Sequence, residues 1–64
     1  MNIKKSIRVC LAVKGMTMPE LAEKLEVSIT RVYRLADNPT ALTINRIAGA
    51  FGMKASEFLA LGEE

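Results

Sequence analysis

The chain has 64 residues, of which half are hydrophobic, and it carries a formal net charge of +2 with one cysteine and no histidine. A chain of this length holds one domain and leaves no room for an enzyme active site besides its scaffold. A lone cysteine cannot form an internal disulfide, and a zinc site needs a set of cysteine and histidine ligands. We therefore expect a protein that is not an enzyme and that holds no metal or cofactor.

The apolar runs and the charge pattern indicate in which compartment the protein works and which kinds of partner it binds. The longest apolar runs are too short to span a membrane, and the first residues lack the apolar core of a signal peptide, so we expect a cytoplasmic protein with no membrane partner. The charges are segregated along the chain, which predicts one basic face. The basic side chains of the first and central segments are Lys4, Lys5, Arg8, Lys14, Arg31 and Arg34, and the carboxylates gather at Glu20, Glu23, Glu26, Glu63 and Glu64.

A first helix is predicted from about Ile3 to Lys14. Its apolar residues Ile3, Ile7, Cys10 and Leu11 follow helical spacing. Gly15 can adopt the left-handed conformation that ends such a helix. We expect Cys10 to be a small core residue with no redox role.

The second helix has the clearest local signal, a capping box that runs from Thr17 to Glu20. Met16 and Leu21 occupy the positions of a hydrophobic staple, and Pro19 is tolerated in a first turn. A helix is therefore predicted to start at about Met18. Its buried face is expected to consist of Leu21, Ala22 and Leu25.

The stretch Val27-Ser28-Ile29 interrupts the helical pattern, and Ser28 can cap a third helix from about Ile29 to Ala36. At 100° per residue, the core side of that helix holds Val32, Leu35 and Ala36. Thr30 and Arg34 fall on the opposite side, with Arg31 and Tyr33 on the flanks. Asp37-Asn38-Pro39 end the helix with residues typical of turns.

Two further helices complete the pattern. Thr40 can cap a fourth helix that continues through Phe51 and is closed by Gly52, and the buried stripe expected on it is Ala41, Ile44, Ile47, Ala48 and Phe51. A last helix, about Ala55 to Leu61, carries Phe58, Leu59 and Leu61 and ends at Gly62. With five short helices and no strand signal, the predicted fold is all-α.

The two helices on either side of the break, about residues 18–36, have the spacing of a helix-turn-helix. Here the chain resembles the DNA-binding domain of the phage Cro and repressor proteins, the XRE family, through MTMPELAEKLEVS, TINRIAGAFGM and SEFLAL. The resemblance implies a single compact, five-helix, lambda-repressor-like helix-turn-helix domain over residues 1–64.

The chain departs from the family pattern at several positions. The turn glycine is Glu26, so either a non-glycine residue is left-handed, at a cost of about 1 kcal/mol, or the turn is reshaped. Leu11 and Ala36 stand where the family pairs an arginine with a glutamate, which suggests an apolar contact in place of an ion pair. Met18 replaces a glutamine, and the loop after the third helix is shorter than usual and has no basic residue.

The resemblance assigns base reading to the start and outer face of the third helix, at Ile29, Thr30, Arg31, Tyr33 and Arg34. Arg34 can bind guanine O6 and N7, Thr30 can reach a base edge or a phosphate, and Ile29 can pack on a thymine methyl. Phosphates are expected at helix starts, at Thr17, Met18, Asn38 and Thr40. For Ile29 and Tyr33, burial or surface packing competes with a DNA contact, and the arginines can also be ordinary solvated charges.

The function that this resemblance implies is a sequence-specific transcriptional regulator, a small Cro-like repressor. It would bind double-stranded DNA as a homodimer, on a pseudo-palindromic operator with half-sites about 34 Å apart. The terminal helix, with Phe58, Leu59 and Leu61, is a candidate dimer interface, and no small-molecule ligand is expected. The rival interpretation is a protein-binding module of the same fold, an antitoxin or an inhibitor of another regulator, which uses the carboxylates of the second helix and the terminal helix.

Overall fold

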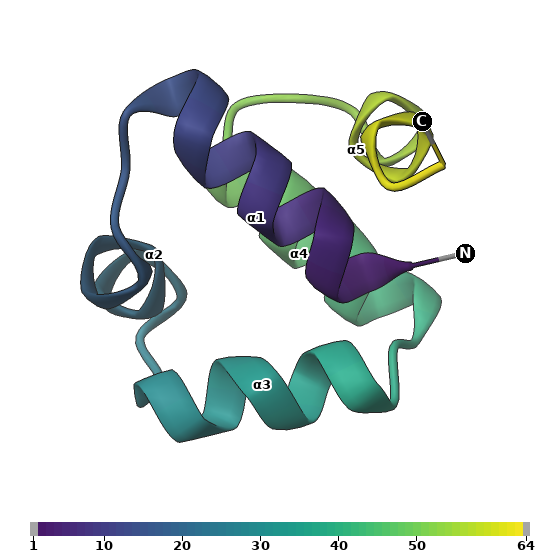
Figure 1. Cartoon of the computed structure of the whole chain (residues 1–64). Helices are drawn as coiled ribbons and strands as arrows, with labels where there is room; N and C mark the ends of the chain where they lie inside the picture. The colour runs from purple at the N-terminus through teal and green to yellow at the C-terminus, as the bar shows by residue number, and fades with distance from the viewer. Residues whose placement is uncertain (1, 64) are drawn as a thin grey trace.

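Five α-helices joined by short turns make up the computed structural model, which describes residues 2–63 (Figure 1). They are α1 (Ile3–Lys14), α2 (Met18–Leu25), α3 (Ile29–Asp37), α4 (Ala41–Ala50) and α5 (Ala55–Leu61). The described part of the chain contains no strand, so the predicted all-α fold is confirmed. The Cα radius of gyration is 10.2 Å, and the principal extents are 26 × 25 × 16 Å.

The helices enclose one core. In Figure 1, α1 crosses in front of α4, while α5 packs against both of these helices and α2 packs against α3 and α4. Helix α3 also contacts α1. Each helix contributes one apolar side chain with 0% exposure, and these five are Cys10, Leu21, Val32, Ile47 and Phe58.

One member of the buried stripe expected on α4 is in fact exposed. Ile44, Ile47, Ala48 and Phe51 are buried as predicted, but Ala41 is exposed. Ala41 is the first residue of α4, directly after the Thr40 cap. It shares the angular position of the buried residues but lies in the first turn of the helix. Helical periodicity alone cannot predict this difference.

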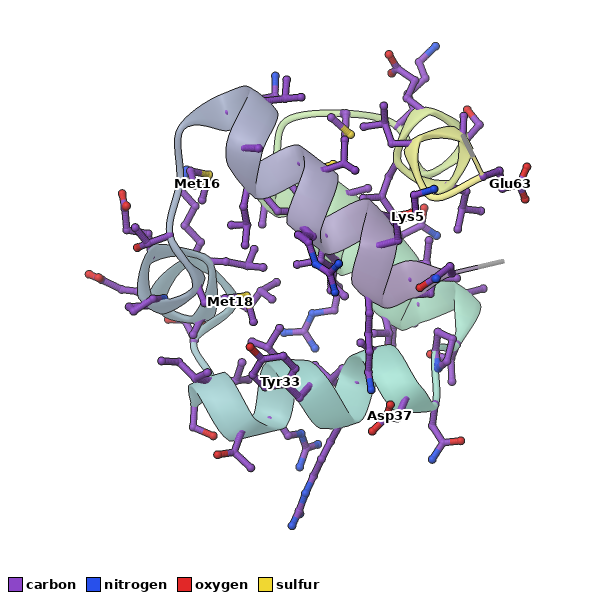
Figure 2. All side chains as sticks on the ribbon, viewed as in Figure 1. Lys5, Met16, Met18, Tyr33, Asp37 and Glu63 are labelled. Atoms are coloured by element: carbon purple, nitrogen blue, oxygen red, sulfur yellow. The ribbon has the colours of Figure 1, made fainter. Side chains whose placement is uncertain are left out.

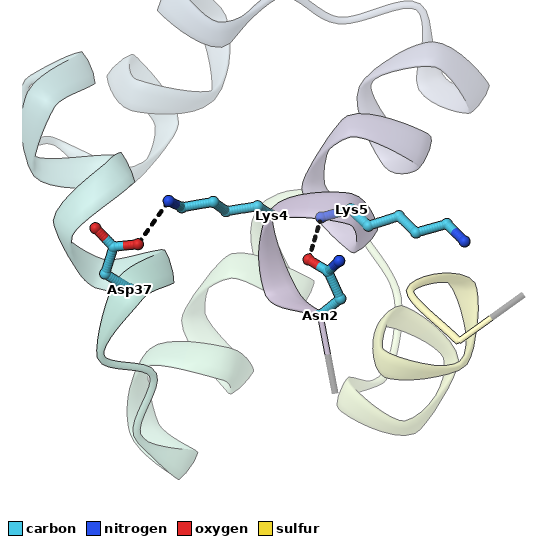
Figure 3. A network of polar contacts seen from close by, with 4 residues as sticks. All are labelled: Asn2, Lys4, Lys5 and Asp37. Carbon is cyan, nitrogen blue, oxygen red and sulfur yellow. Dashed lines mark hydrogen bonds and ion pairs between the residues drawn. The ribbon is translucent and has the colours of Figure 1, made fainter.

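Side-chain caps start the first four helices. The predicted caps Thr17, Ser28 and Thr40 accept hydrogen bonds from the backbone N–H groups three residues ahead, at 3.4, 3.1 and 3.2 Å. The capping box is complete because the Thr17 N–H donates to Glu20 Oε1 at 3.1 Å. Asn2, which the sequence analysis did not identify, caps α1 by accepting from the Lys5 N–H at 3.0 Å (Figure 3).

Left-handed residues end the first two helices. Gly15 has φ 64°, as predicted, and Glu26 has φ 59°. The turn at Glu26 is therefore not reshaped, and the first of the two alternatives for this residue is the one observed. Behind it, the Val27 N–H donates to the Ala22 carbonyl at 3.0 Å, which closes the end of α2. A side chain at this φ carries the steric cost that glycine avoids.

The end of α5 lies directly against the start of α1. Gly62 is buried, and a methyl group added to it would overlap Ser6 Oγ and lie 2.5 Å from the Asn2 carbonyl oxygen. Gly62 has φ −80°, so it is the close approach, not the backbone conformation, that requires glycine here. Ser6 itself is 0% exposed, and its hydroxyl has no hydrogen-bond partner within the described residues.

Substitutions at this contact should have opposite effects on stability. Gly62→Ala should lower the free energy of unfolding by about 1–3 kcal/mol, because the added methyl overpacks the contact between α1 and α5. Ser6→Ala should be neutral or stabilising by about 1 kcal/mol, because it removes a buried hydroxyl without a partner. Urea unfolding followed by circular dichroism measures both. A large loss of stability in Ser6→Ala would show that the Ser6 hydroxyl does have a hydrogen-bond partner.

The left-handed residue that ends α2 gives a second stability prediction. Glu26→Gly should raise the free energy of unfolding by up to about 1 kcal/mol, because glycine adopts φ 59° without steric cost. The matched control is Glu23→Gly, an exposed position inside α2, which should lower stability by about 1 kcal/mol. The same unfolding experiment compares the two, and equal losses would show that Glu26 is not strained.

Candidate nucleic-acid interface

The inner side of α3 is held by the core, and its start is held by the turn after α2. Residues 26–28 form that turn, and the Ser28 hydroxyl accepts from the Arg31 N–H at 3.1 Å. On the inner side, Val32 is 0% exposed, Ala36 is 7% exposed, and Leu35 is half-buried. This agrees with the core side that the sequence predicted. Helix α3 therefore cannot rotate about its axis without exposing apolar surface.

The outer side of α3 presents polar side chains without partners. Thr30, Arg31 and Arg34 are all exposed. Within residues 2–63, none of these side chains forms an ion pair or a hydrogen bond. The two guanidinium groups are therefore free to bind an acceptor from outside the molecule, such as a base edge or a phosphate.

Ile29 and Tyr33 lie one helical turn apart on a flank of α3. Ile29 is 40% exposed and Tyr33 is 50% exposed, so neither is a core residue. Figure 2 shows Tyr33 on the side of α3 that faces α1 and α2, where its ring lines a cavity. Tyr33 was expected to read bases together with the outer polar side chains. In the structure its ring lies on a different side of α3 from theirs. The helical wheel placed Tyr33 on a flank but could not tell what this flank would face.

The start of α2 is a poorer phosphate site than expected. The Thr17 N–H donates to the Glu20 carboxylate at 3.1 Å, and the Thr17 hydroxyl donates to the same oxygen at 3.0 Å. This places a negative charge at the helix N-terminus, which repels phosphate. The side chain of Met18 is apolar and half-buried, and it lines the same cavity as Tyr33 (Figure 2). It therefore offers no hydrogen bond to a phosphate.

The start of α4 is the better of the two candidate phosphate sites. Asn38 and Thr40 are exposed, and the first turn of α4 contains no acidic residue. The Thr40 hydroxyl accepts from the Thr43 N–H and donates to Thr43 Oγ1 at 3.0 Å, so it serves the helix cap. The Asn38 side-chain amide makes no hydrogen bond within residues 2–63. The positive end of the α4 dipole is therefore uncompensated next to α3.

An ion pair that sequence reasoning missed joins α1 to the end of α3. Lys4 Nζ lies 2.6 Å from Asp37 Oδ1, and both side chains are more than half exposed (Figure 3). A pair this exposed contributes up to about 1 kcal/mol. It also neutralises one of the basic residues that the charge pattern assigned to a basic face. No spacing rule could predict it, because the two residues lie on helices that are far apart in sequence.

A cavity of about 140 Å³ lies between α1, α2 and α3. Leu11 and Ala36, the positions for which an apolar contact was expected, both line this cavity. Leu11 packs against the core and Ala36 is buried, so the apolar character of the site is as expected. Both side chains therefore belong to the walls of one space between the helices.

The candidate dimer interface on α5 is smaller than predicted. Phe58 is 0% exposed and stacks on Phe51 with a ring-centroid distance of 6.2 Å, so it is a core residue and is not available to a second subunit. Leu59 and Leu61 are half-buried against the core. The most exposed large apolar side chains are on other helices, Val13 at 66% on α1 and Leu42 at 68% on α4.

Cys10 has the properties of a core residue. Burial raises the pKa of its thiol, and the positive charge of Lys14 lowers it by a smaller amount. The thiol donates to Met53 Sδ at 3.7 Å. A protonated, buried thiol is a poor nucleophile. In the described part of the chain, no group of three or more histidine, cysteine, aspartate and glutamate residues is placed to hold a metal ion, and no helix is long and apolar enough to cross a membrane.

No protein-family model, curated protein or solved structure matches the chain. The outer side of α3 and the helix starts beside it are therefore the features that bear on the function of this chain.

Proposed function

We propose that this protein is a sequence-specific DNA-binding regulator, a small repressor of the Cro type, with a lambda-repressor-like helix-turn-helix formed by α2 and α3. One observation carries the proposal. The inner side of α3 is clamped by the core, while Thr30, Arg31 and Arg34 on its outer side are exposed and unpaired within residues 2–63. A helix held in this way can enter the DNA major groove, which is about 12 Å wide.

The roles of individual residues follow from their positions. Arg34 binds guanine O6 and N7 through its two-pronged guanidinium, and Thr30 reaches a neighbouring base edge or phosphate. Arg31 contributes a second cation on the same side. The start of α4, with Asn38, binds a phosphate and fixes the register of α3 on the duplex. Ile29, at the first turn of α3 and 40% exposed, contacts a thymine methyl.

DNA binding in this proposal requires two copies of the chain. Few free cations face the DNA, so one copy makes few phosphate contacts and binds weakly. Two copies would each present one α3 helix to the DNA, on half-sites about 34 Å apart. In the dimer, the exposed parts of Leu59 and Leu61 form the contact.

A second candidate function is the protein-binding module. The observation that favours it is the acidity of α2, where Glu20, Glu23 and Glu26 are exposed and Glu20 lies at the helix start. These negative charges repel DNA from that side of the molecule and attract a basic protein partner. A partner bound there would depend on Glu23 and be indifferent to Arg34.

Selection of bound fragments from random DNA tests the proposed function. Fragments that share a two-fold symmetric sequence should be enriched, with two chains bound per fragment in sedimentation experiments. Affinity should fall steeply with salt, because phosphate contacts release counterions. If no sequence is enriched at low salt, the DNA-binding proposal is wrong and the protein-binding module becomes the better candidate.

Replacing Arg34 should remove sequence preference. In fluorescence anisotropy with an enriched fragment, Arg34→Ala should weaken specific binding by about 1–3 kcal/mol and leave binding to unrelated DNA much less affected. The matched control is Lys14→Ala, which removes one exposed positive charge from the last turn of α1, at the end of that helix distant from α3 (Figure 1). Equal effects of the two substitutions would show that Arg34 contributes only general charge.

A further inference from the structure

The cavity between α1, α2 and α3 is not explained by DNA binding. Its volume is about 140 Å³, and its walls come from three helices. The lining residues are Lys4, Ile7, Arg8, Leu11, Met18, Val32, Tyr33 and Ala36. Three of them, Lys4, Arg8 and Tyr33, are exposed, so the cavity opens to solvent between these side chains.

The inner part of this cavity is apolar. Leu11 and Met18 are half-buried, and Val32 is 0% exposed at its floor. An apolar protein cavity of about 150 Å³ is known to bind benzene. The space therefore suits one six-membered ring or a short branched chain, and it is too small for a nucleotide or a long acyl chain.

The mouth of this cavity carries one unneutralised cation. Lys4 Nζ is 2.6 Å from Asp37 Oδ1, so its charge is already compensated (Figure 3). Arg8 forms no ion pair and no side-chain hydrogen bond within residues 2–63. None of the lining residues is acidic. The mouth thus attracts an anion, and a guanidinium binds a carboxylate through two parallel hydrogen bonds.

We propose that this cavity binds a free small-molecule carboxylate with one ring or a short branched chain. The carboxylate pairs with Arg8, and the apolar part lies between Leu11, Met18 and Val32. Both halves of such a ligand contribute to its affinity. A hydrocarbon would leave the charge of Arg8 unused, and an inorganic anion would leave the apolar walls unused. No small-molecule ligand was expected, since a chain of this length has no room for a separate ligand-binding domain. This site forms only where three helices pack together.

Benzoate is the probe that matches this volume and charge, and benzyl alcohol is its neutral counterpart. We expect titration of the ¹⁵N-labelled full chain with benzoate to give saturable chemical-shift changes at residues that line the cavity. Benzyl alcohol should bind at the same residues and more weakly. Inorganic phosphate at matched ionic strength should give no saturable change there. Saturable benzoate shifts elsewhere, or none at all, would overturn the proposal.

Substitutions separate the charged and apolar parts of the site. Arg8→Gln should weaken benzoate binding by about tenfold or more and leave benzyl alcohol binding unchanged, because only the carboxylate uses the guanidinium. The matched control is Arg31→Gln, which removes an exposed arginine of α3 outside the cavity and should change neither affinity. Equal loss in the two variants would overturn the assignment of Arg8.

Filling the cavity tests its apolar walls. Leu11→Phe should abolish binding of both probes, because the larger side chain occupies the space of the ring. Ala36→Val is a second filling variant in case Leu11→Phe does not fold, and the dispersion of the amide spectrum reports folding for each. Unchanged benzoate binding in a folded filling variant would overturn the proposal.

Discussion

The structure depends on the burial of the inner side of α3. This helix has nine residues, which is too short to be stable in water without tertiary contacts. Val32 in the middle of the helix and Ala36 in its last turn supply those contacts, and the Ser28 cap and the Lys4–Asp37 pair hold its two ends. Because the apolar residues occupy one side, the polar residues Thr30 and Arg34 must face solvent. The exposed arginine is thus a consequence of core packing.

Helix stability and phosphate binding compete for the same backbone amides. At α2 the Glu20 carboxylate takes the Thr17 N–H and complements the helix dipole, which stabilises a helix of only eight residues. The same carboxylate makes this helix start unfavourable for an anion. At α4 the hydroxyl of Thr40 provides the cap without adding charge, so the dipole stays available. Two helix starts that both carry a threonine cap therefore differ in what they can bind, because only one has a carboxylate three residues ahead.

The contact between α1 and α3 combines an ion pair with a cavity. Asp37 at the end of α3 is drawn to Lys4, while Leu11 and Ala36 leave space between the helices. Three residues of α3 form part of the cavity wall, namely Val32, Tyr33 and Ala36. The same helix carries Arg31 and Arg34. Any molecule in the cavity would touch the helix that carries the proposed base-reading side chains. The two sites are therefore adjacent in structure, although they use different side chains and different chemistry.

The sequence by itself determined the five helices, the caps of α2, α3 and α4, and the inner side of α3. These features rest on hydrogen bonds and backbone preferences within a few residues, as at Thr17, Ser28 and Gly15, or on the angular spacing of side chains around one helix. Only the tertiary structure decided that Phe58 is fully buried, that Ala41 is exposed and that Tyr33 lines a cavity. It also decided which cation is neutralised, because Lys4 and Asp37 meet across two helices. These outcomes depend on how distant helices are placed relative to one another, and spacing along the chain carries no information about that placement.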